Sequence, residues 1–395
     1  MSQTKAQLVD AVDGSIVAAD LASNSVTTAK VVDSAITADK FSFPVANRNL
    51  IINGAMQVSQ RGTSFSGTAQ QYTLDRMQMN TAGNDEIAQT EQAAVTAGGA
   101  YTSGFRKCMK IINGNQTSGA GAADLVHLKM VLEAQDIANS GWNYTSTSSD
   151  ITLSFWIKSS VEQDFPITLR SEDGTRQVYN MTTGSLTADT WTKVTKTIPG
   201  NSNLQFDDDA NAGLTLFINA FVGTDYTTGG LAQNAWSAWS SAKQGDNMTS
   251  TWYTTNNATL EITGLQLELG STATDFEHRT YQDEIKRCMR YFQKIHNTQI
   301  IFSKNTSSRF RLSAQFIVPM RGTPSYTRTS NSLDAQGVAT TLSSSNTTEA
   351  QGGNTAVSDG ISYARQWDFA GWTSLENRSH GGASGSHVFN LDSEL

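Results

Sequence analysis

"TLEITGLQLEL", residues 259–269, is the stretch that decides the fold of this chain. Apolar side chains alternate with polar ones from Leu260 to Ile262 and again from Leu265 to Leu269, with Gly264 between the two runs. Such alternation places the apolar residues on one face of a β-strand. One extra residue at the glycine, as in a β-bulge, keeps both runs on the same face. The stretch therefore predicts a long, bulged strand that lines a core.

Other stretches show the same alternation, and polar turn residues separate them. Short strands at this spacing are typical of two antiparallel sheets packed as a sandwich. Between residues 47 and 280, only the stretch "HLKMVLEAQDIANS" (127–140) predicts a helix. Residues 47–280 therefore predict a large jelly-roll sandwich with insertions. The predicted strands include "ITLSFWIKSS" (151–160, with Ile151, Leu153, Phe155 and Ile157 on one face), "GLTLFINAF" (213–221) and "WTKVTKTI" (191–198), which alternates less strictly.

The composition favours a mainly β protein, because 16% of residues are charged, 38% are apolar, and small polar residues fill much of the rest. Such residues suit strand faces and tight turns. The net charge of −8 argues against a nucleic-acid partner, because proteins that bind nucleic acids present a basic face to them. No stretch reaches the 18 apolar residues of a membrane span, so we expect no membrane insertion. We expect Cys108 and Cys288, far apart and each beside a methionine, to be buried free thiols.

Residues 14–41 repeat an apolar residue at every fifth position. Five residues turn an α-helix by 140° beyond a full turn, so this spacing forms no helical stripe. In a straight strand it sends successive apolar residues to opposite faces. Parallel copies wound around a common axis would bury the whole set, which predicts an intertwined trimeric shaft; a disordered linker is the alternative. The predicted shaft core is Ile16, Leu21, Val26, Val31, Ile36 and Phe41.

The chain divides into three predicted domains. Residues 1–46 form the N-terminal attachment and shaft segment, and residues 47–280 form the sandwich. Residues 281–395 comprise one helix followed by a small β-rich domain. That helix is predicted over residues 281–295, "YQDEIKRCMRYFQKI", because its apolar residues follow the spacing of one helix face.

All three segments resemble one family. The repeat "SVTTAKV" at residues 25–31 resembles the slender shafts of trimeric bacteriophage fibre proteins. The stretches "NLIINGAMQVSQRG", "YTLDRM" and "GLQLELGSTATDFEHR" resemble a sandwich domain of phage tail fibres, which is itself similar to carbohydrate-binding jelly-rolls. The stretches "CMRYFQK" and "FIVPMRGTP", with "LDSEL", resemble a C-terminal fibre module. The chain thus looks like a tail-fibre-like virion protein.

The resemblance implies a structural virion protein that assembles in the host cytoplasm as a homotrimer. Its N-terminal segment would attach to other virion proteins of the tail or capsid, and its distal domains would bind host surface polysaccharide. One alternative is a structural component without a receptor role, such as a capsid-decorating fibre or a tail adaptor. Another alternative is a polysaccharide depolymerase.

Two aromatic clusters are candidate glycan-binding residues, because a ring face can cover the apolar C–H patch of a sugar. For the first cluster the alternative is packing of Trp236 and Trp239 on one short helical turn in the core. For the second cluster the alternative is a trimer interface. The candidates are Trp236, Trp239, Trp252 and Tyr253 in the first cluster, and Trp367 and Trp372 in the second.

The motifs of common enzyme classes do not occur in the sequence. It contains no HExxH pattern, no Gly-x-Ser-x-Gly elbow and no phosphate loop, so we expect neither catalysis nor a cofactor. Asp207, Asp208 and Asp209 are a weak calcium candidate, since hard oxygen ligands suit this ion. A solvated turn is the alternative for these three residues.

Overall fold

The computed structural model describes residues 47–395 apart from several short gaps and two longer ones. Residues 47–395 form one compact unit. The predicted shaft core from Ile16 to Phe41 lies outside the described residues. The gaps are residues 67–68, 231, 246–247, 297–299, 307–308, 323, 329–331, 336–337, 342–363 and 371–386.

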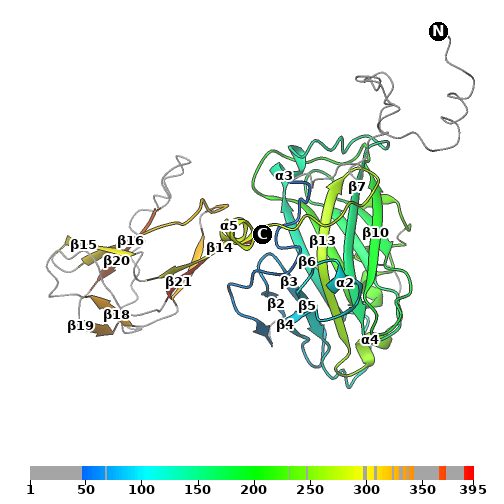
Figure 1. Cartoon of the computed structure of the whole chain (residues 1–395), viewed down its shortest axis with the longest axis horizontal. Helices are drawn as coiled ribbons and strands as arrows, with labels where there is room; N and C mark the ends of the chain where they lie inside the picture. Colours follow the sequence, from blue (N-terminus) through cyan, green and yellow to red (C-terminus); the bar gives the residue numbers. More distant parts are fainter. Residues whose placement is uncertain are drawn as a thin grey trace, which may run out of the picture. The chain divides into compact units, whose positions relative to one another are not determined.

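Two antiparallel sheets pack face to face and form the predicted β-sandwich (Figure 1). Sheet A has six strands in the order β1 (Ser64–Phe65), β4 (Gln89–Ala94), β5 (Lys107–Ile112), β13 (Thr259–Leu269), β7 (Asp150–Ser159) and β10 (Thr192–Pro199). Sheet B has seven strands in the order β12 (Trp236–Ala238), β9 (Gln177–Thr182), β8 (Pro166–Ser171), β11 (Ala212–Val222), β6 (Leu125–Glu133), β3 (Gln78–Ala82) and β2 (Gln70–Tyr72).

Strand β13 has the bulge that its sequence predicts. Its pairing with β7 shifts register between Thr263 and Gln266, and Gly264 between them has a φ of 68°. That angle lies in the left-handed region, which glycine adopts at little cost. The apolar residues on both sides of the bulge are buried in the core, as predicted. Leu269, at the end of the strand, is the exception and is 40% exposed.

The core lies between the two sheets and is built from alternate residues of their strands. In β7 the side chains of Ile151, Leu153, Phe155 and Ile157 are buried, as the alternation predicts. The short helix α4 (Thr251–Thr254) adds two large aromatic side chains to the same core. Burial of each large apolar side chain contributes about 1.5–3 kcal/mol to the stability of the fold.

The prediction of a helix over residues 127–140 is wrong. Strand β6 occupies Leu125–Glu133, and only Ala134–Ala138 is helical, as α3. The strand lies between β11 and β3, so its backbone hydrogen bonds go to two neighbours rather than to a helix. Sheet pairing and burial override the weak local helix preference of this stretch.

The helix predicted over residues 281–295 is six residues shorter than expected. Helix α5 spans Tyr281–Met289, and Thr280 caps it by accepting a hydrogen bond from the Asp283 N–H. The chain continues as strand β14 (Phe292–His296), which pairs with strand β21 (His387–Asp392). The apolar residues near the end of the predicted helix therefore belong to a strand, where side chains alternate between the two faces of the sheet.

The C-terminal part consists of small antiparallel sheets. Strand β21 is the middle strand of the first of them, between β14 and β17. Both cysteines are buried free thiols, as predicted. Among the described residues, no helix is long and apolar enough to cross a membrane. The remaining strands are β15 (Ile300–Thr306), β16 (Arg309–Gln315), β17 (Ser325–Arg328), β18 (Ser332–Ala335), β19 (Val338–Thr341) and β20 (Ala364–Ala370).

Candidate functional site

The outer face of sheet A carries a second, smaller apolar layer. Helix α2 (Gly98–Thr102) packs on this face, and Figure 1 shows it against the sheet that contains β13 and β7. The chain segment 270–280, which follows β13, crosses the same face. The side chains that pack between these elements are Ala55, Val95, Ala100, Phe105 and Cys108, with Ala93, Trp156, Trp191 and Phe276 beside them.

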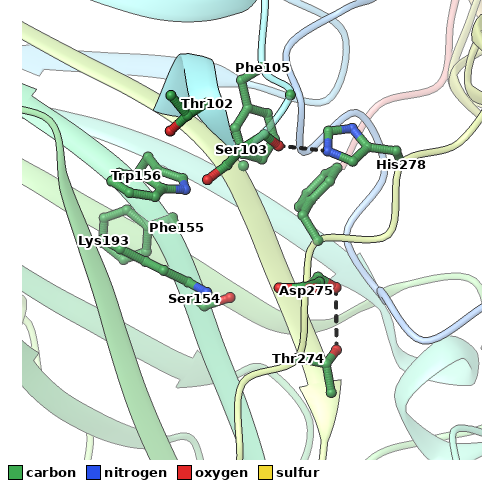
Figure 2. Close-up of a pocket in the computed structure, with 13 residues that line it drawn as sticks. Thr102, Ser103, Phe105, Ser154, Phe155, Trp156, Lys193, Thr274, Asp275 and His278 are labelled. Carbon is green, nitrogen blue, oxygen red and sulfur yellow. Dashed lines mark hydrogen bonds between the residues drawn. The ribbon is translucent and has the colours of Figure 1, made fainter. Parts of the chain in front are cut away.

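A pocket of about 550 Å³ opens within this layer (Figure 2). Strands β7, β10 and β13 supply its floor and one wall, and α2 and the segment after β13 supply the rest. Its volume is within the range of about 300–1,000 Å³ that is typical of small-molecule sites. The lining residues are Thr102, Ser103, Gly104, Phe105, Ser154, Phe155, Trp156, Lys193, Gly264, Thr274, Asp275, Phe276 and His278.

The β7–β10 wall of the pocket presents three polar donors. Ser154 and Trp156 alternate with buried core residues of β7, so their side chains point away from the core into the pocket. Lys193 of β10 pairs with Trp156 in the ladder and lines the same wall. The Ser154 hydroxyl, the Trp156 indole N–H and the Lys193 ammonium make no hydrogen bond to any residue that the structure describes.

The opposite wall is aromatic. The rings of Phe105, Phe276 and His278 lie 4.8–5.1 Å apart, centroid to centroid, in edge-on or tilted arrangements. The His278 Nε2 atom lies 3.0 Å from the backbone carbonyl oxygen of Ser103, which fixes the imidazole at the rim (Figure 2). The pocket therefore has an apolar side and a side rich in donors.

Two glycines allow the pocket to form. A Cβ on Gly99 of α2 would lie 2.4 Å from the Trp156 ring, so only glycine lets the helix rest on this indole. A Cβ on Gly264 would lie 2.5 Å from the Phe105 ring. The bulge that sets the register of β13 thus also makes room for one aromatic wall.

The rim carries a carboxylate on the segment after β13. Asp275 is exposed, and its backbone carbonyl accepts a 2.7 Å hydrogen bond from Arg48 Nη2. The preceding residue, Thr274, is held by Glu268, whose carboxylate accepts from both its backbone N–H and its hydroxyl. These contacts fix the segment while leaving the Asp275 side chain at the mouth of the pocket.

Cys108 lies buried in the second layer, where its thiol contacts the Ala93 carbonyl and the Glu261 carboxylate, each at 3.7 Å. Burial, with the neighbouring Glu261 carboxylate, raises the pKa of its thiol to about 12. The reactive form of cysteine is the thiolate, which this environment suppresses at neutral pH.

Of the first predicted aromatic cluster, Trp252 and Tyr253 are core residues. Their exposed fractions are 0% and 1%, and Tyr253 stacks on Phe221 of β11 with 4.3 Å between the ring centroids. This corrects the expectation that they form an exposed sugar platform. The sandwich core requires large side chains at α4, and these two supply them.

Trp236 and Trp239 are half-buried and lie on no helical turn, so the predicted helical alternative is also wrong. Trp236 begins β12, packs on Tyr179 and donates from Nε1 to the Pro199 carbonyl at 2.7 Å. Trp239 lies near the guanidinium groups of Arg170 and Arg176, at 5.1 and 5.5 Å from its ring centroid. Neither tryptophan lines the pocket.

The second predicted cluster is only partly described. Trp367 lies in β20, opposite Leu312 of β16 in the ladder. Trp372 lies outside the described residues.

The aspartates of the calcium candidate have separate local partners. Asp208 accepts from Asn139 Nδ2 at 2.7 Å, and Asp209 accepts from the backbone and side-chain N–H groups of Asn211. Asp207 accepts from Gln205 Nε2 at 3.1 Å. Within the part of the chain that the structure describes, no group of three His, Cys, Asp or Glu residues is placed to hold a metal ion.

None of the residues that line the pocket is a site residue predicted from the sequence. Trp156 carried the available signal, because it is a large apolar residue at a polar position of the alternation in "ITLSFWIKSS". A second layer on the outer face of a sheet needs apolar residues at such positions, and Trp156 is one. The partners of Trp156 could not be read from the sequence, since α2 and the segment after β13 lie about 55 and 120 residues away along the chain.

Comparison with known proteins gives no family. No protein-family model and no curated protein sequence matches the chain. Among solved structures, the enzymatically active domain of tailspike protein 4 from bacteriophage CBA120 is 8% identical, with 56% of this chain and 21% of that one covered and a TM-score of 0.30. This chain therefore spans about a fifth of that structure.

Two carbohydrate-binding domains are also similar. The N-terminal cellulose-binding domain of β-1,4-glucanase C from Cellulomonas fimi is 11% identical, with 50% of this chain and 90% of that one covered and a TM-score of 0.26. A family 11 carbohydrate-binding module from Clostridium thermocellum, in complex with a mixed-linked tetrasaccharide, is 13% identical, with 55% and 98% covered and a TM-score of 0.24. Values this low leave function to be argued from the pocket itself.

Proposed function

We propose that this protein binds a saccharide in the pocket on the outer face of sheet A. One observation carries the proposal: donors without partners on Ser154, Trp156 and Lys193 face an aromatic wall across a pocket of about 550 Å³. A sugar ring has an apolar C–H face and a rim of hydroxyl groups. The aromatic wall suits the C–H face. The donors suit the hydroxyl groups, which can also donate to the Asp275 carboxylate.

Binding without catalysis fits the pocket better than hydrolysis does. Glycosidases use two carboxyl groups on either side of the scissile bond. Among the lining residues that the structure describes, Asp275 supplies the single carboxylate. We therefore assign the pocket a binding role, and release of reducing ends from a bound polysaccharide would contradict this assignment.

The sequence supports a place for this binding function on a virus particle. The five-residue apolar repeat in residues 14–41 favours a parallel homotrimer, and the stretches quoted above from all three segments resemble phage fibre proteins. We propose a bacteriophage fibre that attaches to the particle through its N-terminal segment and presents its pockets to a host surface glycan. Sedimentation of the full chain tests the trimer, and a stable monomer would contradict it.

Trp156→Ala is the direct test of the pocket. We expect the full-length protein to bind members of a glycan array. We expect Trp156→Ala to weaken the best interaction at least about fivefold, since it removes part of the wall and the indole N–H donor, and one hydrogen bond contributes about 0.5–1.5 kcal/mol. Trp239→Ala is the matched control, because this half-buried tryptophan lies outside the pocket.

Equal loss in both variants would contradict a site at Trp156. An array without any bound glycan, from protein with a native unfolding transition, would favour the purely structural alternative of a decorating fibre or adaptor.

A further inference from the structure

The pocket has more donors than a neutral sugar requires, and they gather on one wall. Ser154 is 3% exposed, yet its hydroxyl lies in the pocket without a partner among the described residues. The Ser154 hydroxyl is not one of the fully buried unpaired side-chain atoms, so it is open to the pocket, where a ligand atom can bond to it. The Trp156 indole N–H can only donate, as can the Lys193 ammonium. The ligand group that faces this wall must therefore be an acceptor.

Lys193 is distinguished from the other cations around the pocket by its lack of a partner. Lys158 pairs with Glu261 at 2.9 Å, and Arg106 donates to the backbone carbonyls of Tyr101 and Phe105. Arg48 donates to the Asp275 carbonyl. Lys193 forms no ion pair with any acid that the structure describes, Asp275 included, although the whole chain has a net charge of −8.

We infer that the pocket selects a saccharide with an anionic substituent and that Lys193 determines this selectivity, an inference that rests on the proposed saccharide binding. The anionic oxygens would face Ser154, Trp156 and Lys193 on the β7–β10 wall. The Asp275 carboxylate, on the separate segment after β13, would accept hydrogen bonds from hydroxyl groups at the mouth (Figure 2). The shared chemistry is an anionic oxygen group, which a uronate, a sugar phosphate or a sugar sulfate can supply.

Matched pairs of sugars test the inference. Binding of galactose and galacturonate, and of glucose and glucuronate, would be measured by ligand-observed NMR titration with the full-length protein. Galactose 6-sulfate and glucose 6-phosphate would separate the possible anions. Because Lys193 is exposed, we expect the acidic member of a pair to bind about twofold to fivefold tighter at low salt, and we expect added salt to reduce the difference.

Lys193→Met should remove the preference for the acidic sugar, because it weakens binding of the acidic sugar more than binding of the neutral one and brings the ratio of their affinities to about one. Lys286→Met is the matched control, because it removes the same charge from an exposed position on α5, outside the pocket. Loss of the preference in Lys193→Met alone supports the inference.

Two other results would overturn it. Equal binding of acidic and neutral sugars, with Trp156→Ala still reducing both, would refute the selectivity and leave the proposed saccharide binding intact. No binding of any sugar by the folded protein would refute both. A preference that Lys193→Met retains would show that another group supplies it.

Discussion

Arg290 holds Glu133 through two hydrogen bonds, from Nε and Nη2, each 2.7 Å long and each to a different carboxylate oxygen. Glu133 ends strand β6 and is fully buried, whereas Arg290 follows helix α5. The Tyr291 hydroxyl donates to the same carboxylate. Burial alone would raise the pKa of Glu133, but the hydrogen bonds from Arg290 and Tyr291 outweigh it and lower that pKa below its usual range. This pair therefore ties the sandwich to the segment that follows it.

Arg290→Met should destabilise the protein, because it leaves the Glu133 carboxylate buried without its cation. Breaking a buried pair costs about 3–5 kcal/mol, and the partial exposure of Arg290 reduces our expectation to about 2–3 kcal/mol. Urea unfolding at pH 7 measures the change. Arg287→Met is the control, since among the described residues the Arg287 side chain makes a single, exposed hydrogen bond, to Asn47, and its cost should stay below about 1 kcal/mol. Similar losses in both variants would mean that the pair has no special role.

Gly99→Ala should weaken sugar binding more than it weakens the fold. The new Cβ would lie 2.4 Å from the Trp156 ring, so the indole or helix α2 must move. Overpacking of this kind costs about 1–3 kcal/mol, which is small beside the stability of a sandwich of this size. We expect a loss of affinity of at least about fivefold in the titration described above. Gly322→Ala, where a Cβ would meet no atom within 4 Å, is the control. Unchanged affinity in Gly99→Ala would contradict the assigned position of Trp156.

Gly264→Ala should be costly because it combines two effects. Its φ of 68° is unfavourable for alanine by about 1–2 kcal/mol, and the new Cβ would lie 2.5 Å from the Phe105 ring. With the overpacking, we expect a loss of about 2–4 kcal/mol in thermal or urea unfolding. Phe105→Leu in the same chain should recover part of the loss, since it removes the clashing ring atoms. Strictly additive effects of the two substitutions would show that the clash is not formed.

The sequence contained enough information to predict the sandwich but not the pocket. In strands such as β7 and β13 the alternation of apolar and polar residues is regular, and the tertiary packing agrees with it. The bulge at Gly264 follows from the same pattern. Strand β6 was missed because its apolar residues fit a helix face as well as a strand, and only pairing with β11 and β3 decides between them. The pocket joins residues from 102 to 278, and a single sequence carries no signal for contacts at that separation.

The aromatic clusters failed as site predictions for a related reason. Composition indicates that a tryptophan is amphipathic, but topology decides which side of a strand it occupies. Trp252 was placed in the core by α4, while Trp156 was placed outside it by the phase of β7. Reading the phase of each strand before ranking its aromatic residues would have favoured Trp156.

His127 should make stability depend on pH. It is 3% exposed on sheet B, and burial, with smaller effects of Lys129 and Arg170, lowers its pKa to about 3. The unfolded chain binds a proton at this residue below about pH 6.5, but the folded protein does not. The free energy of unfolding should therefore fall as pH drops from about 6.5 toward 3, by up to about 1.4 kcal/mol per pH unit. In His127→Gln this contribution disappears, so its stability should fall less steeply between pH 7 and 4.5 in urea unfolding. Parallel profiles for the two proteins would refute the assignment.

The position of β21 has a consequence for biosynthesis. This strand, residues 387–392, is the middle of its sheet, and the nearby Glu394 pairs with Arg61 and with Arg76, whose side chain is almost completely buried. The last strand of the sandwich ends at Leu269, so a nascent chain that has closed its sandwich holds these two guanidinium groups without Glu394 until more than 100 further residues have been synthesised. Translation that stops before β21 would leave Arg76 buried without Glu394, and β14 and β17 without the strand between them, so the truncated chain should be less stable than the full one and more open to proteolysis.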